Sequence, residues 1–174
     1  VIYPQLASEW HPSKNGSQRP DQVTPNARQS IWWKCPEGPD HEWKTRISHR
    51  TTKGTGCPFC AGMRLSVTNS LAALHSQIGA QLHPGLNGGL TATDIIAGSS
   101  KSVWWKCTEG PDHEWLSTVA NRTSNGAGCP CCSGNQLSVT NSLAGRFPDV
   151  AEQWHPTKNV GVTPDQIISG TGKI

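Results

Sequence analysis

The chain has 174 residues, of which 34% are hydrophobic and 16% charged, and its formal net charge is +3. No apolar run approaches the roughly 20 residues that a membrane-spanning helix needs, so we expect no membrane partner. A net charge this small also argues against tight binding of many phosphates by this chain alone. The aromatic residues are eight Trp, two Phe and one Tyr, so we expect a thin core built from a few large side chains.

The sequence repeats itself with a displacement of 72 residues. Residues 31–60 read IWWKCPEGPDHEWKTRISHRTTKGTGCPFC, and residues 103–132 read VWWKCTEGPDHEWLSTVANRTSNGAGCPCC. A period of this length indicates tandem structural units rather than one domain. We therefore divide the chain into a first repeat (1–72), a second repeat (73–144) and the truncated start of a third (145–174). Because the chain begins and stops within a repeat, we expect it to be part of a longer array.

Each repeat opens with a segment that reaches a His-Pro pair: PQLASEWHPSKN from residue 4, AQLHPGLN from residue 80 and AEQWHPTKN from residue 151. Pro stops a helix, and an Asn three residues beyond it tolerates the left-handed conformations of a turn. We predict helix ends at these points, with His11, His83 and His155 facing solvent near the carbonyl terminus. These histidines are poor candidates for metal ligands, because each zinc site described below has its four ligands without them.

Two short strands are expected next in each repeat. In the first copy they are Ile31 to Cys35 and the alternating stretch Trp43, Thr45 and Ile47, with the turn PEGPD between them. The hairpin would carry Cys35 and His41 at its tip. A loop rich in Gly and Pro would then bring a Cys-x2-Cys pair opposite that tip.

Three thiolates and one imidazole make the closed tetrahedral shell that structural zinc prefers. We predict two zinc ions per chain, held by Cys35, His41, Cys57 and Cys60 and by Cys107, His113, Cys129 and Cys132. Structural zinc contributes about 10–16 kcal/mol in small finger peptides, enough to stabilise a repeat with a thin core. The seventh cysteine, Cys131, stands where the first copy has Phe59 and is expected to be a spare, partly buried thiol. Metal ligation rather than disulfides favours a reducing intracellular compartment, the cytoplasm or the nucleus or nucleoid.

Helices are expected after the Cys-x2-Cys pair, beginning at the octapeptide LSVTNSLA (65–72 and 137–144), whose Thr, Asn or Ser can cap them. Apolar residues then recur at three- and four-residue steps: Leu71, Leu74, Ile78 and Leu82 in one copy, and Leu143, Phe147, Val150 and Trp154 in the other. Because Gly79 and Pro148 interrupt these patterns, we predict one broken helix or two short ones per repeat. The expected fold class is a small zinc-stabilised α+β repeat, a β-hairpin plus zinc knuckle followed by one or two short helices.

The pattern WWKC…GPDHEW…R…GxGCPxC, preceded by EWHPxKN, resembles the family of tandem probable zinc-ribbon, or treble-clef zinc finger, repeats. The resemblance covers nearly the whole chain and implies nucleic-acid binding as the shared role. One departure is the ligand spacing, because Pro39–Asp40 and Pro111–Asp112 lengthen the hairpin turn to Cys-x5-His. The longer turn affects the expected geometry of the hairpin tip more than the identity of the residues that bind zinc.

Comparison of the two copies separates what is retained from what varies. The zinc ligands, three Trp and one Arg are held in both, whereas Lys44, Arg46 and Lys53 become Leu116, Thr118 and Asn125. Residues 1–72 carry nine Lys or Arg and five Asp or Glu, and residues 73–144 carry three and four. Weak nucleic-acid binding centred on the first repeat is therefore predicted, with the candidate contacts Lys34, Lys44, Arg46, Arg50, Lys53, Arg64 and Arg122.

Two residue types at this candidate surface have alternative roles. Adjacent Trp32 and Trp33 point to opposite faces of a strand, so one fills the core and the other packs elsewhere, stacks on a base or seats a partner's side chain. Arg50 and Arg122 either stack on Trp within the fold or bind phosphate.

The main alternative function is a protein-interaction or spacer array without nucleic-acid contact. We expect no enzymatic activity, because each zinc set is complete, whereas a catalytic zinc keeps an open position. The extra histidine of the first copy, His49, is Asn121 in the second. The sequence does not fix the oligomeric state.

Overall fold

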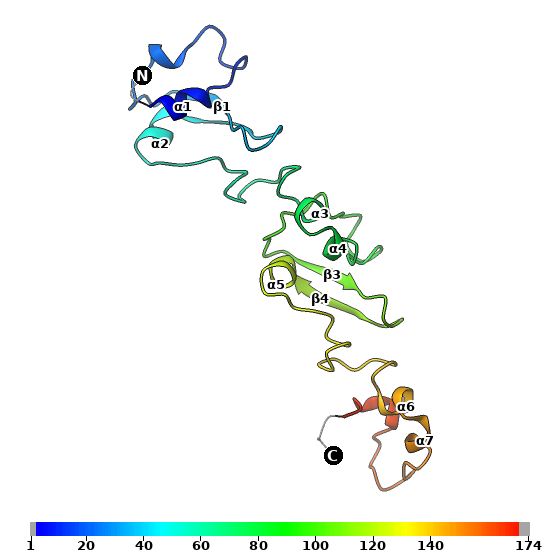
Figure 1. Cartoon of the computed structure of the whole chain (residues 1–174). Helices are drawn as coiled ribbons and strands as arrows, with labels where there is room; N and C mark the ends of the chain where they lie inside the picture. Colours follow the sequence, from blue (N-terminus) through cyan, green and yellow to red (C-terminus); the bar gives the residue numbers. More distant parts are fainter. Residues whose placement is uncertain (1–2, 171–174) are drawn as a thin grey trace. The chain divides into compact units, whose positions relative to one another are not determined.

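The computed structural model describes residues 3–170 (Figure 1). Its contacts divide into two units: Val1–Ser76 with Ala92–Ala97, and Gln77–Thr91 with Gly98–Ile174. The segment 92–97 therefore belongs with the first unit, although a division at residue 72 places it in the second repeat. No helix among the described residues is long and apolar enough to cross a bilayer.

The first unit is built on an antiparallel hairpin of β1 (Ser30–Lys34) and β2 (Glu42–Arg46), in which Trp33 lies opposite Trp43. A short helix α1 (Pro4–Ser8) and a 3-10 turn η1 (Pro20–Gln22) precede the hairpin. Helix α2 (Ile47–Thr51) follows it directly, and α3 (Leu71–Leu74) comes after the Cys-x2-Cys loop (Figure 1). The hairpin and short helices confirm the predicted α+β class.

The second unit repeats this order. Its hairpin consists of β3 (Ser102–Lys106) and β4 (Glu114–Thr118), with Trp105 opposite Trp115, and α5 (Val119–Thr123) follows. The remaining elements are α4 (Ser76–Gly79), α6 (Leu143–Arg146), α7 (Pro148–Ala151) and η2 (Pro164–Gln166).

One strand end and one expected apolar face differ from the sequence prediction. Ile47 begins α2 rather than ending a strand: its N–H still bonds the Gln29 carbonyl at 3.1 Å, and its side chain is buried. The apolar series from Leu71 does not form one helix face, because Leu71 is fully buried whereas Leu74 is 57% exposed. The chain forms two short helices in each copy, which confirms one of the two predicted forms. In the second copy Pro148 begins the second helix, where its missing N–H costs nothing.

The segment before each hairpin pairs with its first strand through a single antiparallel bridge, Trp10 with Trp33 and Leu82 with Trp105. The His11 N–H bonds the Trp32 carbonyl at 3.1 Å, and the Lys34 N–H bonds the Glu9 carbonyl at 2.8 Å. Asn15 adds a two-bond clamp, because its side-chain amide donates to the Trp32 carbonyl (2.9 Å) and accepts from the Trp32 N–H (2.8 Å). Asn87 clamps Trp104 in the same way, so the retained Asn fixes the segment to the strand.

His11 is not at the surface, which corrects the prediction for the His-Pro histidines. Its side chain is 4% exposed, with Nε2 3.2 Å from a Glu42 carboxylate oxygen. Its Nδ1 accepts from the N–H groups of Ser13 and Lys14, so it caps the following turn rather than meeting a carbonyl terminus. His83 repeats these contacts at 12% exposure, and only His155 is exposed.

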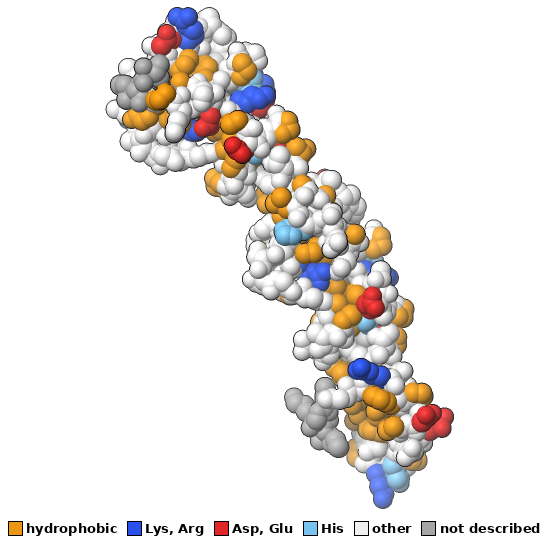
Figure 2. Space-filling view, viewed as in Figure 1, with side chains coloured by type: hydrophobic (Ala, Val, Ile, Leu, Met, Phe, Trp, Pro, Cys, Tyr) orange, Lys and Arg blue, Asp and Glu red, His pale blue; other side chains and the backbone are white. Residues whose placement is uncertain are grey.

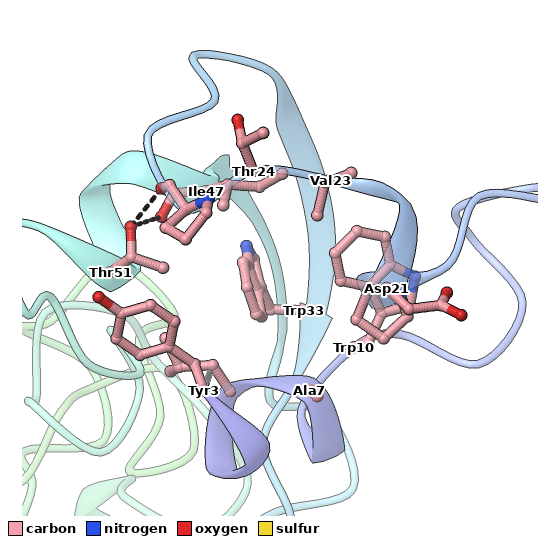
Figure 3. A pocket seen from close by; sticks show the side chains of 12 residues that line it. Tyr3, Ala7, Trp10, Asp21, Val23, Thr24, Trp33, Ile47 and Thr51 are labelled. Atoms are coloured by element: carbon pink, nitrogen blue, oxygen red, sulfur yellow. Dashed lines mark hydrogen bonds between the residues drawn. The ribbon is translucent and has the colours of Figure 1, made fainter. Parts of the chain in front are cut away.

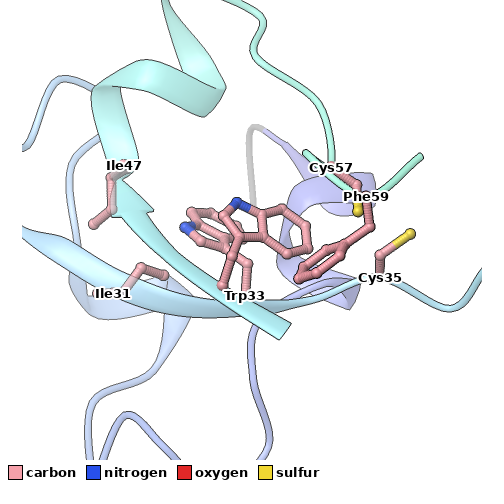
Figure 4. Packing of buried hydrophobic residues seen from close by; sticks show 7 residues of the cluster. Ile31, Trp33, Cys35, Ile47, Cys57 and Phe59 are labelled. Atoms are coloured by element: carbon pink, nitrogen blue, oxygen red, sulfur yellow. The ribbon is translucent and has the colours of Figure 1, made fainter. Parts of the chain in front are cut away.

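The core of the first unit is one cluster on the inner face of the hairpin. Figure 4 shows the Trp33 ring at its centre, with Ile31 and Ile47 on one side and Cys35, Cys57 and Phe59 on the other. Trp33 is 2% exposed, whereas its neighbour Trp32 points outward and is half-buried. The core therefore runs directly into the cysteine cluster.

Candidate metal centre

Four potential ligands converge at the tip of the first hairpin. Cys35 follows β1 directly and His41 precedes β2, while Cys57 and Cys60 lie in the loop after α2. The Sγ atoms of Cys35 and Cys60 are 3.7 Å apart, and His41 Nδ1 lies 3.7 Å from Cys57 Sγ and 3.5 Å from Cys60 Sγ. All four ligand atoms lie within 4.8 Å of one another.

The second unit reproduces this cluster with Cys107, His113, Cys129 and Cys132. The corresponding distances are 3.7 Å between the Cys107 and Cys132 sulfurs, and 3.7 and 3.5 Å from His113 Nδ1 to the sulfurs of Cys129 and Cys132. The two sites therefore have the same geometry.

The type and closeness of the four donors in each cluster fit a zinc ion. Burial, followed by the neighbouring sulfurs, raises the pKa of Cys60 and of Cys132 to about 12, and burial also raises the pKa of Cys35. Thiols crowded in this way resist ionisation unless a cation is present, and a divalent metal bound by thiolates reverses that preference. Three sulfurs and one imidazole nitrogen are a structural zinc donor set, and zinc here would hold the hairpin tip to the Cys-x2-Cys loop.

A second layer of polar groups orients the histidine. His41 Nε2 lies 2.9 Å from both Ser66 Oγ and Thr68 Oγ1, and Ser66 donates to an Asp40 carboxylate oxygen at 2.8 Å. Because the Ser66 hydrogen goes to Asp40, its oxygen accepts from Nε2–H, which leaves Nδ1 unprotonated toward the cysteines. The Val67 N–H bonds the other Asp40 oxygen at 3.0 Å and is the main cause of a lowered Asp40 pKa.

The second site has the same layer in Ser138, Thr140 and Asp112. His113 Nε2 lies 2.9 Å from Ser138 Oγ and 2.7 Å from Thr140 Oγ1, and Ser138 donates to Asp112 at 3.0 Å. From sequence, the Pro-Asp insertion indicates only a longer turn, whereas in the structure its Asp supports the histidine ligand. Retention of GPDH and LSVT in both copies was the available signal for this layer.

A glycine in each hairpin turn makes room for the imidazole. A Cβ added to Gly38 would lie 2.6 Å from two ring atoms of His41, and one added to Gly110 would lie 2.5 Å from two ring atoms of His113. These distances are well inside van der Waals contact, so no larger residue fits without moving the ligand.

The sequence matches the family described as "Probable Treble clef zinc finger domain" over residues 6–63 and again over 78–135. These matches cover most of the chain and contain every member of the two Cys3His clusters. The chain belongs to this treble clef zinc finger family. No curated protein matches the chain.

Cys131 lies beside the zinc ligands of the second treble clef unit without joining them. It is 1% exposed, more deeply buried than predicted, and burial is the main reason that its pKa rises to about 11. In the first unit the same position holds Phe59, whose ring stacks on His41 with centroids 5.1 Å apart. All seven cysteines are free thiols, which fits a reducing compartment.

The retained arginine of each treble clef unit lies inside the fold. Arg50 is 5% exposed, sits 4.8 Å from the Trp33 ring centroid and 5.0 Å from that of Trp43, and donates to Glu9 at 2.9 Å. Arg122 is 6% exposed, lies over Trp105 and Trp115, and donates to Gln81 instead of a carboxylate. Burial lowers its pKa, and the nearby Cys129 and Cys107 sulfurs oppose that effect. This placement corrects their inclusion among candidate nucleic-acid contacts: both serve the core.

The other candidate cations lie on the surface of the first unit. Lys44 and Arg46 are exposed on the outer face of β2, and Lys34 lies on the same face of β1, bonded to Glu42 at 3.2 Å. Lys53 and Arg64 are exposed in loops away from the strands. Three of the five remaining candidate nucleic-acid contacts therefore lie together on the outer face of the first hairpin.

Proposed function

We propose that these tandem structural zinc units recognise nucleic acid, with the outer face of the first hairpin as the contact surface. The observation that carries the proposal is the register of β1 and β2, which sets Trp32 directly opposite Lys44. Arg46 lies two residues further along the same face, and Lys14 lies 4.8 Å from the Trp32 ring centroid. A flat aromatic ring among cations is what stacking on a base and pairing with phosphate require.

The charges on this face are not all neutralised. Lys14 and Lys34 pair with Glu42, but neither Lys44 nor Arg46 forms an ion pair among residues 3–170. The face visible in Figure 2 nevertheless shows scattered Lys and Arg rather than one continuous basic patch. Each Cys3His zinc site would also add one net negative charge. Binding by this chain alone is accordingly proposed to be weak and strongly dependent on salt.

The second repeat supplies a matched control for this proposal. The residues equivalent to Lys44 and Arg46 are Leu116 and Thr118, on a hairpin of the same register. We expect the double variant Lys44→Leu/Arg46→Thr to bind labelled duplex DNA more weakly than wild type and with a salt slope smaller by about one to two. Lys158→Ala, at an exposed position outside the hairpins, serves as the charge control.

Titrations of the zinc-loaded chain at two salt concentrations make the test. Absent binding, or an affinity indifferent to salt, would refute the proposal. So would equal effects of the hairpin variant and Lys158→Ala. A single-stranded DNA and an RNA of the same sequence, titrated alongside, identify the preferred nucleic acid.

A second candidate function is protein binding, favoured by the outer face of the second hairpin. Trp104 is 37% exposed and Leu116, its cross-strand partner, is 56% exposed. Paired exposed apolar residues are typical of an interaction surface. A nuclease-treated pull-down that recovers one partner, and loses it with Leu116→Lys but not with Val160→Lys, would favour this function over the first.

We propose a binding rather than a catalytic role, because each Cys3His set fills all four tetrahedral positions and leaves none for substrate. We also propose a reducing compartment, the cytoplasm or the nucleus or nucleoid, because zinc-binding thiolates are retained as such only where disulfides do not form.

A further inference from the structure

The first unit has an apolar groove of about 240 Å³ beside its core. Its walls come from α1, from residues 20–25 and from the hairpin side chain Trp33. Figure 3 shows Tyr3 and Ala7 on one side, Val23 and Thr24 on the other, and Trp33 at the back of an open space. The groove thus opens directly onto the central Trp of the core.

The segment equivalent to 20–25 in the next repeat is covered. Residues 92–97 correspond to 20–25 at the period of 72, and an Asn-Ser-Leu segment (69–71) runs antiparallel to them. The Leu71 N–H bonds the Ile95 carbonyl at 2.7 Å, and the Ala97 N–H bonds the Asn69 carbonyl at 3.0 Å. Leu71 itself is 0% exposed.

The same pairing occurs one period later, inside the second unit. The Leu143 N–H bonds the Ile167 carbonyl at 2.8 Å, and the Ser169 N–H bonds the Asn141 carbonyl at 2.8 Å. Ser142 and Ile168 form the bridge that Ser70 and Ile96 form in the first unit. The Asn-Ser-Leu segment of one repeat therefore covers the wall segment of the following repeat in both places.

The first repeat has the wall but, among residues 3–170, no such covering segment. Val23 and Thr24 stand at the positions of Ile95 and Ile96, and within the described chain Val23 makes no backbone hydrogen bond. Counting back 72 residues from 65–72 gives the eight positions immediately ahead of Val1, where a preceding repeat would carry LSVTNSLA. The apolar groove therefore lies beside residues 20–25, and the equivalents of these residues in the later repeats are paired with an Asn-Ser-Leu segment.

We propose that this groove is the acceptor site for the Asn-Ser-Leu segment of a repeat that precedes Val1, with its Leu filling the space in front of Trp33. The Val23 carbonyl accepts the Leu N–H, as Ile95 and Ile167 do. Pro25 replaces Ala97 and has no N–H, so one of the hydrogen bonds seen at the other two junctions is lost here. Burial of the Leu side chain is then the main source of stabilisation, equivalent to about tenfold to a hundredfold in an equilibrium constant.

An in-register extension tests the proposal on the full chain. LSVTNSLA is fused directly to Val1, and the matched control carries Asp in place of the extension's second Leu, the residue that corresponds to Leu71. Unfolding of the zinc-loaded proteins in denaturant is followed together with hydrogen exchange of the first unit. We expect the Leu extension to lower the unfolding constant of that unit by about tenfold or more relative to the Asp extension. Equal unfolding constants would overturn the proposal.

A groove-filling variant locates the effect. Ala7→Phe, from the groove wall, is expected to remove the gain, whereas Val160→Phe, at a position 88% exposed, is expected to leave it intact. If the Ala7→Phe chain fails to retain two zinc ions, Val23→Glu replaces it as the blocking variant. A gain that survives both blocking variants would show that the Leu binds elsewhere.

Sedimentation of the unextended chain distinguishes the source of the segment. A monomer at all concentrations is expected if the groove is reserved for a preceding repeat. A concentration-dependent dimer that Ala7→Phe abolishes would instead assign the groove to a second copy and overturn the proposal as stated.

Discussion

Replacement of Gly38 by Ala is expected to damage the first zinc site while leaving the second intact. The new Cβ would lie 2.6 Å from both Cδ2 and Nε2 of His41, and ordinary contact begins at 3.4 Å. The imidazole would have to retreat by roughly 0.8 Å in a packed site. Its position is fixed on both sides, because Nε2 bonds Ser66 and Thr68 and Nδ1 faces the cysteine sulfurs.

The cost can be built from these contacts. Loss of two hydrogen bonds of about 1 kcal/mol each, with overpacking of about 1–3 kcal/mol, gives about 3 kcal/mol at the lower end. If this destabilisation affects only the folded, zinc-bound state, the zinc affinity of the first site decreases about a hundredfold. Gly38→Ala also restricts the unfolded chain, an opposite effect of about 0.4–1 kcal/mol that needs its own control.

Gly56→Ala provides that control, because a Cβ there meets nothing within 4 Å. Zinc content per chain is measured after equilibration with a competing chelator, and unfolding is followed in denaturant. Gly38→Ala should retain about one zinc where Gly56→Ala retains two. Gly110→Ala should affect the other site equally. If Gly38→Ala and Gly56→Ala behave alike, the steric argument for the turn glycine is refuted.

Three further predictions concern the groups around the zinc sites. Asp40→Asn should weaken zinc binding at the first site about tenfold to a hundredfold in chelator competition, because Ser66 and Val67 lose the carboxylate that orders them. Cys60→Ser should abolish one zinc and expose only the first unit to hydrogen exchange; simultaneous loss of the second would show that the units are not independent. Gln81→Glu should raise the unfolding free energy of the second unit by about 1 kcal/mol in denaturant, by giving buried Arg122 a charged acceptor, whereas a decrease would mean that burying the carboxylate costs more than the bond supplies.

The sequence by itself determined the repeat, the hairpins and the eight zinc ligands. These features depend on local spacing, which the sequence shows directly. The four ligands of the first site recur 72 residues later, and three Cys with one His at this spacing are typical of a zinc site. Strand alternation also predicted that one Trp of each pair points inward, but only the burial of Trp33 and Trp105 in the structure shows which one.

The tertiary structure decided the roles of the polar residues. The sequence left Arg50 open between stacking on Trp and binding phosphate. The structure decides for stacking, because Arg50 lies against the rings of Trp33 and Trp43 and pairs with Glu9, 41 residues away in sequence. Asp40 became a support for the zinc-binding histidine through Ser66, 26 residues away, and His11 became a buried cap. Segment 92–97 joined the first unit through backbone hydrogen bonds that no side-chain pattern encodes. Spacing along the chain fixes which ligands are available, but a polar side chain takes its role from distant neighbours, and only folding brings those together.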